Sequence, residues 1–318
     1  MARILDSKVL PGKVGTIVPS GSKARLIGRV QDWSISANRT VAREAAGTES
    51  PFKIDVRFLG GLTDTQQKAF KDAARRWTSI IVGDLPAVVV DGEEIDDILI
   101  VAEGVSIDGA GTILGQAGPT RLRPRTAGTA SLLPAKGIMK FDSADLGKME
   151  SAGTLVDVIT HEMGHVLGIG TLWGEKNLLR GVGTMNPRFT GPRARKAYGI
   201  LKGSGLSTDV PVENRGGIGT RDSHWREAIF LNELMSGFVA EAGNPISSVT
   251  VGSLEDIGYT VAPDAAEHFE LANVAALAEA GKLERRDGPF ARGVVLPNIP
   301  TVLPDESLVA GGSNGRRH

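Results

Sequence analysis

AGTLVDVITHEMGHVLGIG, residues 152–170, is the stretch of sequence that decides how the rest of this chain is interpreted. Its apolar residues recur at helical spacing, which predicts a helix over 152–167 with one broad buried face. Gly168 and Gly170 follow, and glycine tolerates the left-handed conformation in which many helices end. The apolar positions are Leu155, Val158, Ile159, Met163, Val166 and Leu167.

The same helix carries a constellation typical of a zinc hydrolase. His161 and His165 are four residues apart, so they lie on one face, one turn apart. Both imidazoles can therefore bind one Zn²⁺ at about 2.0–2.1 Å. Glu162 points about 100° further round the helix. It can contact the attacking water without binding the metal, which suits a general base. A coincidental surface helix is the alternative, but the strongly apolar helix and the scarcity of His, five in the chain, argue against it.

The residues after His165 resemble the metzincin pattern of metallopeptidases. In that pattern a Gly after the second His turns the chain toward a third His, and a catalytic zinc normally has three protein ligands. Gly168 fits the turn, but Thr171 stands where the usual third His would be. Three His remain as candidates: His224, His268 and His318. His268 falls in an expected solvated helix, and His318 is terminal.

We expect His224 to be the third ligand, because a second metzincin feature lies shortly after it in the chain. Met235, within Glu233–Gly237, looks like the Met-turn of metzincins, in which a Met packs beneath the metal without binding it. An ordinary core Met is the alternative interpretation. An arrangement with a long insertion between the motif helix and the third His resembles the leishmanolysin (M8) branch of the metzincins. The resemblance spans about Phe52 to Val261. Because many leishmanolysins are rich in cysteine and this chain has none, it resembles a stripped-down bacterial relative.

The resemblance implies an α+β fold of the metzincin type. An upper subdomain, about 51–168, would have a twisted mixed sheet and two helices, the second carrying the metal motif. A lower, irregular subdomain, about 169–262, would complete the metallopeptidase domain, 51–262. The substrate would lie between the two, and Ile113–Gln116 or its neighbours could pair with it as an edge strand.

Periodicity elsewhere is consistent with this order of elements. Phe52–Leu59 alternates apolar and polar residues as a strand does, and Thr63 or Asp64 can cap a helix over Thr65–Ile81. Residues 106–119 are rich in glycine, which indicates a loop leading into a short extended piece. Further strands are expected at Leu85–Val90, Asp97–Ala102 and Ile138–Asp142.

The two ends are less regular. We expect residues 1–50 to be an N-terminal extension, either a pro-segment, a docking segment or a loosely packed leader. Residues 263–318 are expected to form a helix over about Ala265–Ala280 and a tail. The insertion carries a basic run that we interpret as a solvated face, made of Arg188, Arg193, Arg195 and Lys196.

Composition excludes several classes of protein. The chain has 36 Lys and Arg against 37 Asp and Glu, so nucleic acid is a poor partner. No cysteine is present, which excludes disulfides, thiolate metal sites and a cysteine-based latency switch. No run reaches the roughly 20 apolar residues of a membrane span, and Asp6 and Lys8 interrupt any signal peptide. We expect secretion or delivery outside the producing cell, with docking through residues 1–50 or the tail, and otherwise a cytoplasmic protein.

Two functions of different classes remain. The first is a zinc endopeptidase acting on proteins or peptides, with one catalytic Zn²⁺ on His161, His165 and His224 and with Glu162 as base. The second is a catalytically silent metallopeptidase-fold module for binding or assembly, such as a delivered effector; the intact Glu162 argues against it.

Weaker candidates surround this site. Asp222 and Glu227 could orient His224, although exposed loop charges are the plainer interpretation. Asp108 offers oxygen atoms to Ca²⁺, but it is more typical of a turn. Tyr259 could approach the metal, although a structural role is the plainer one.

Overall fold

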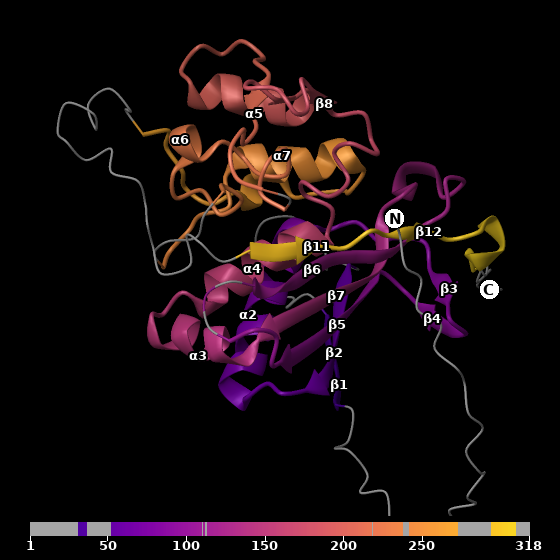
Figure 1. The fold of residues 1–318 in the computed structure, drawn as a ribbon. Helices are drawn as coiled ribbons and strands as arrows, with labels where there is room; N and C mark the ends of the chain where they lie inside the picture. Colours follow the sequence, from indigo (N-terminus) through magenta and orange to yellow (C-terminus); the bar gives the residue numbers. More distant parts are fainter. Residues whose placement is uncertain are drawn as a thin grey trace, which may run out of the picture.

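The computed structural model describes residues 31–36, 52–109, 111, 113–217, 219–237, 242–272 and 294–309. Its main element is a seven-stranded mixed sheet in the order β1-β2-β5-β7-β6-β11, with β12 also paired to β6 (Figure 1). Strands β2, β5 and β7 run parallel, and β6 runs antiparallel to β7. The strands are β1 (Gln31–Ser36), β2 (Lys53–Gly60), β5 (Ile98–Val105), β6 (Ile113–Leu122), β7 (Pro134–Asp142), β11 (Val294–Pro297) and β12 (Thr301–Val302).

Two helices pack together beside this sheet. The predicted first helix is confirmed as α2 (Asp64–Ile80), and Thr63 and Gln66 form a capping box at its start. The motif helix is α4 (Leu155–Val166), preceded by a further helix, α3 (Ser143–Ser151), that we did not predict. The indole nitrogen of Trp77 on α2 donates a hydrogen bond of 2.9 Å to the Thr160 carbonyl on α4. This buried bond fixes the motif helix against its neighbour.

The strand predictions differ from the structure mainly in length. Only Val88–Val90 (β3) of the expected strand Leu85–Val90 is extended, and it pairs with β4 (Glu93–Ile95) outside the main sheet. The short extended piece expected after the glycine-rich loop is the ten-residue strand β6. Pairing along the whole length of β7 explains this, because a strand's length depends on its partner as well as on its own residues.

The lower half, named after the expected lower subdomain and drawn at the top of Figure 1, has short elements around an aromatic core. They are β8 (Leu179–Arg180), β9 (Arg188–Phe189), β10 (Val210–Pro211), α5 (Pro192–Leu201), α6 (Glu227–Phe230) and α7 (Ser248–Ile257). Trp173 lies 4.5 Å from Trp225 and 4.9 Å from Phe189 between ring centroids, and all three are buried. Two of the four residues of the expected basic face pair with acids: Arg193 contacts Glu255 and Arg195 contacts Asp209. Together, the helices and the mixed sheet confirm the expected α+β architecture.

The expected helix at Ala265–Ala280 is wrong over the part that the structure describes. Pro263–Ala265 forms a single 3-10 turn, and residues 266–272 are not helical. Tertiary contacts explain the difference: the Glu267 carboxylate accepts hydrogen bonds from Arg76 and from the Ile246 amide. The remainder of the range, with His318, lies outside the described residues.

Both ends of the chain contribute to the main sheet. Gln31–Ser36, within the expected N-terminal extension, form β1 and pair antiparallel with β2. Residues 294–302, within the expected tail, form β11 and β12 and pair parallel with β6. The sheet therefore extends beyond the expected domain, 51–262, at both ends. Among the described residues, no helix is long and apolar enough to cross a membrane.

Candidate metal centre

Helix α4 presents its two His residues from a buried position. Every residue of the helix except Val156 is buried. The helix ends as expected: Gly168 has φ of 110°, and a side chain there would come within 2.6 Å of Leu172. Only glycine fits both the conformation and the space, so the chain turns sharply away from the helix at this point.

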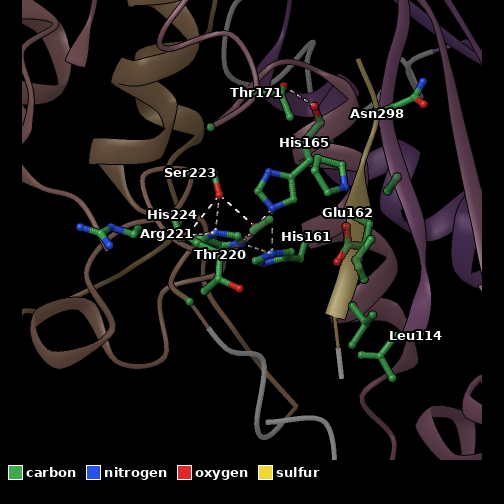
Figure 2. Close-up of a pocket in the computed structure, with 17 residues that line it drawn as sticks. Leu114, His161, Glu162, His165, Thr171, Thr220, Arg221, Ser223, His224 and Asn298 are labelled. Carbon is green, nitrogen blue, oxygen red and sulfur yellow. Dashed lines mark hydrogen bonds between the residues drawn. The ribbon is translucent and has the colours of Figure 1, made fainter. Parts of the chain in front are cut away.

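Three imidazoles converge on one point, as Figure 2 shows. The Nε2 atom of His161 lies 3.1 Å from that of His165 and 3.0 Å from that of His224, and the third distance is 2.9 Å. His224 comes from a loop 59 residues beyond His165. The structure therefore brings together the two helical His and the distant one.

Each imidazole is oriented through its other nitrogen. The Nδ1 atoms of His161, His165 and His224 lie 2.6, 2.8 and 2.9 Å from the carbonyl oxygens of Leu234, Ile169 and Thr220. Because a carbonyl only accepts, each Nδ1 must carry the proton, and each Nε2 directs a lone pair at the common point. Three converging lone pairs repel one another unless a cation lies between them.

This donor set fits zinc. Three neutral imidazoles are a familiar ligand set for Zn²⁺, and tetrahedral ligands at 2.0–2.1 Å would place their nitrogens roughly 3.3 Å apart. Burial lowers the pKa of His161 to about 3 and of His165 to about 4, and it lowers the pKa of His224 as well. The imidazoles therefore stay neutral at physiological pH, which is the state that binds metal.

Glu162 faces the same cavity. Its side chain is only 6% exposed, and its Oε2 atom has no hydrogen-bond partner within the described part of the chain. Burial raises the pKa of this carboxyl to about 8. The cavity, about 250 Å³, is lined by Glu162 and the three His on one side and by Leu114 and Ala117 of β6 on another. A carboxyl with a raised pKa, facing a cleft, is typical of a proton-transfer group.

Comparison with known proteins agrees with this geometry. The family model described as Leishmanolysin, peptidase M8, matches residues 128–282, which include all three converging His. Residues 128–282 are therefore similar to the leishmanolysin family. A leishmanolysin homolog from Crithidia fasciculata is 29% identical over 137 residues, which cover 40% of this chain and 20% of that protein. The match thus spans about a fifth of this relative, and the bacterial origin stays a prediction.

Met235, within the matched residues 128–282, lies against the motif helix. It is fully buried, and a side chain added at Gly164 would come within 2.8 Å of its sulfur. The preceding residue, Leu234, supplies the carbonyl that holds His161. The turn that carries Met235 therefore touches α4 twice, through the sulfur and through this carbonyl.

Glu233 anchors this turn, and the sequence alone gave no indication of its role. It is fully buried, and its carboxylate accepts hydrogen bonds from the Met235 amide, from the amide and hydroxyl of Ser247, and from the Thr250 hydroxyl. These bonds connect the turn to α7. An acidic residue within an apolar segment was the only signal, and it did not reveal which groups would satisfy the charge.

The weaker candidates play other roles. His224 is oriented by Thr220 and Ser223, while Asp222 accepts from the Gly183 amide instead. The Tyr259 hydroxyl donates to the Leu167 carbonyl, which supports its structural interpretation.

Two further candidates lie in other surroundings. Asp108 accepts from the Ile113 amide, as in a turn. The His268 side chain is 88% exposed and lies 3.7 Å from Glu270.

Proposed function

We propose that this chain is a zinc-dependent endopeptidase of the leishmanolysin family. His161, His165 and His224 would hold one Zn²⁺, and Glu162 would act as general base. One observation carries the proposal: three Nε2 lone pairs converge within 3.1 Å beside a carboxylate oxygen that lacks a partner among the described residues. Met235 would pack beneath the ligands without binding the metal, since it contacts α4 at Gly164.

The residues of the site divide the chemistry between them. Zinc bound here supplies a Lewis acid, which polarises the scissile carbonyl and lowers the pKa of water. Glu162 accepts the proton of the attacking water as the oxygen bonds to the carbonyl carbon. The same carboxyl then donates that proton to the leaving amide nitrogen as the C–N bond breaks. Burial favours the protonated carboxyl, so it can hold the proton between the two steps.

The substrates are inferred from the family and from the shape of the site. Protein substrates are what a metallopeptidase family implies. The cavity lies between strand β6 and the loop that leads to His224, since Leu114, Ala117, Gly219 and Thr220 all line it. An extended peptide can lie between these walls with its backbone along β6.

Replacement of Glu162 by Gln tests the proposal. The variant should keep one zinc per chain, because the three His are untouched. Its cleavage of casein and of quenched fluorescent peptides should fall by about 10²–10⁴-fold, the usual contribution of a general base. Glu175→Gln, at an exposed glutamate, serves as the control and should leave both readings unchanged.

Two results would contradict the proposal. One is a folded chain that binds no zinc. The other is a folded, zinc-loaded chain that cleaves neither casein nor the quenched fluorescent peptides. The second result would instead favour a silent binding or assembly module.

A further inference from the structure

The strand edge that faces the cleft is covered by the chain's own C-terminal segment. Strand β11 pairs parallel with β6, from Val294 opposite Ile113 to Pro297 opposite Ala117. Beyond the strand, the Asn298 side chain accepts a hydrogen bond from Gln116 and donates one to the Pro119 carbonyl. In Figure 1, β11 lies between the sheet and the lower half.

The segment also touches the opposite wall of the cleft. A side chain added at Gly219 would come within 2.7 Å of the Val295 carbonyl oxygen. Gly219 belongs to the loop that carries His224. The backbone of residues 294–298 is therefore enclosed between β6 on one side and this loop on the other.

The segment shares the cavity of the metal centre. Val295, Pro297 and Asn298 line it together with Glu162 and the three His. Figure 2 shows β11 passing beside Glu162 and Leu114. Any extended peptide that reached the cavity along the edge of β6 would need the positions that residues 294–298 occupy.

We propose that residues 294–298 occupy the edge of β6 at residues 113–117 as an internal competitor of the extended substrate. This inference rests on the proposed function. Main-chain pairing with a strand edge accepts many sequences, so one edge can bind both the segment and a substrate. A tethered segment competes at a high effective concentration, of the order of millimolar. Substrate therefore binds the small fraction of molecules in which the segment has left.

Two single substitutions in the full-length chain weaken the segment. Asn298→Ala removes both hydrogen bonds of the Asn298 side chain to β6. Gln116→Ala removes only the bond between Gln116 and Asn298. Each bond is worth a factor of about five, so kcat/KM should rise up to about 30-fold for Asn298→Ala and about fivefold for Gln116→Ala. The increase in kcat/KM should come from a lower KM, with kcat unchanged. Glu306→Ala, at an exposed residue eight positions beyond Asn298, is the matched control.

A binding measurement separates this inference from the proposed function. A fluorescein-labelled peptide with the sequence of residues 292–304, but carrying Asn298→Ala so that it does not itself use the Gln116 bond, is titrated against the same variants, each combined with Glu162→Gln so that nothing is cut. Its Kd should fall from the parent to Gln116→Ala to Asn298→Ala, and Glu306→Ala should match the parent. If the Kd follows this order but no variant cleaves, the peptide site stands and the proposed function fails.

The opposite result is equally clear. If folded Asn298→Ala and Gln116→Ala bind the labelled peptide no better than the parent, and kcat/KM is unchanged or lower, the segment is a permanent wall of the cleft. The proposal would then be wrong, while cleavage by the parent would leave the peptidase function intact.

Discussion

At the scale of single residues, the candidate metal centre depends on carbonyl groups as much as on its imidazoles. Leu234, Ile169 and Thr220 each accept a hydrogen bond from one Nδ1 atom, and so direct the opposite nitrogen toward the common point. These acceptors are main-chain atoms, so no residue type in the sequence reports them. The identities of His161, His165 and Glu162 were predictable from spacing, whereas their orientation was not.

Asp97 is a buried carboxyl away from this site, and it gives the protein a pH dependence. Its oxygens accept hydrogen bonds of 2.8 Å from the amides of Lys53 and Leu85. Burial raises the pKa of Asp97 to about 7, against about 3.9 in an unfolded chain. Between these two values the folded state binds more protons, so the free energy of unfolding falls as the pH rises through this window.

Asp97→Asn removes that titration. The free energy of unfolding of the parent should fall between pH 5 and pH 8 by up to about 2–3 kcal/mol more than that of the variant. Urea unfolding at both pH values measures this difference. Other buried carboxyls are common to both proteins, so they cancel in the comparison. An equal pH dependence in parent and variant would show that Asp97 ionises normally in the folded state.

At the scale of elements, close approach between α4 and its neighbours depends on a glycine. A side chain on Gly164 would meet the Met235 sulfur at 2.8 Å and the Trp77 ring at 3.0 Å. Gly147, within α3, has no atom within 4 Å of the same added carbon. Both lie in helices, where alanine is intrinsically better than glycine by up to about 1 kcal/mol.

The two glycines therefore predict opposite effects of the same substitution. Gly164→Ala should destabilise the protein by about 1–3 kcal/mol, because the added methyl overpacks the contact with Met235 and Trp77. Gly147→Ala should stabilise it by up to about 1 kcal/mol. Urea unfolding of both variants measures the effects. If Gly164→Ala is as stable as Gly147→Ala, the contact between α4 and the Met235 turn is looser than described.

At the scale of the whole molecule, the three His connect the two halves. His161 and His165 belong to the helix beside the main sheet, and His224 belongs to the lower half. A metal ion bound by all three would link them, and a ligand that binds only the folded state stabilises it. Zinc at a thousandfold excess over its Kd contributes roughly 4 kcal/mol.

Removal of the metal should therefore lower the melting temperature of the parent by roughly 5–10 °C. His224→Ala should bind zinc much more weakly and respond little to a chelator, whereas His268→Ala should behave like the parent. Differential scanning calorimetry with and without EDTA, together with zinc analysis, measures both effects. Equal zinc retention by the two variants would mean that His224 is not the third ligand.

The sequence by itself determined the features that depend on local spacing. It predicted α2 with its cap at Thr63, the alternating strand β2, and the motif helix with two His, one Glu and the terminating Gly168. Each of these arises from the helical or strand period over a few turns or residues, with little help from the rest of the chain.

Tertiary structure decided the features that depend on contacts between distant residues. It brought His224 next to the motif helix and packed Met235 against Gly164. It also supplied the hydrogen-bond donors of the Glu233 carboxylate and the contacts that keep Glu267 outside a helix. It also added residues 294–302 to the edge of β6. The physical reason is shared: these groups are positioned by main-chain hydrogen bonds and packing between distant segments, and no local periodicity encodes which segments will meet.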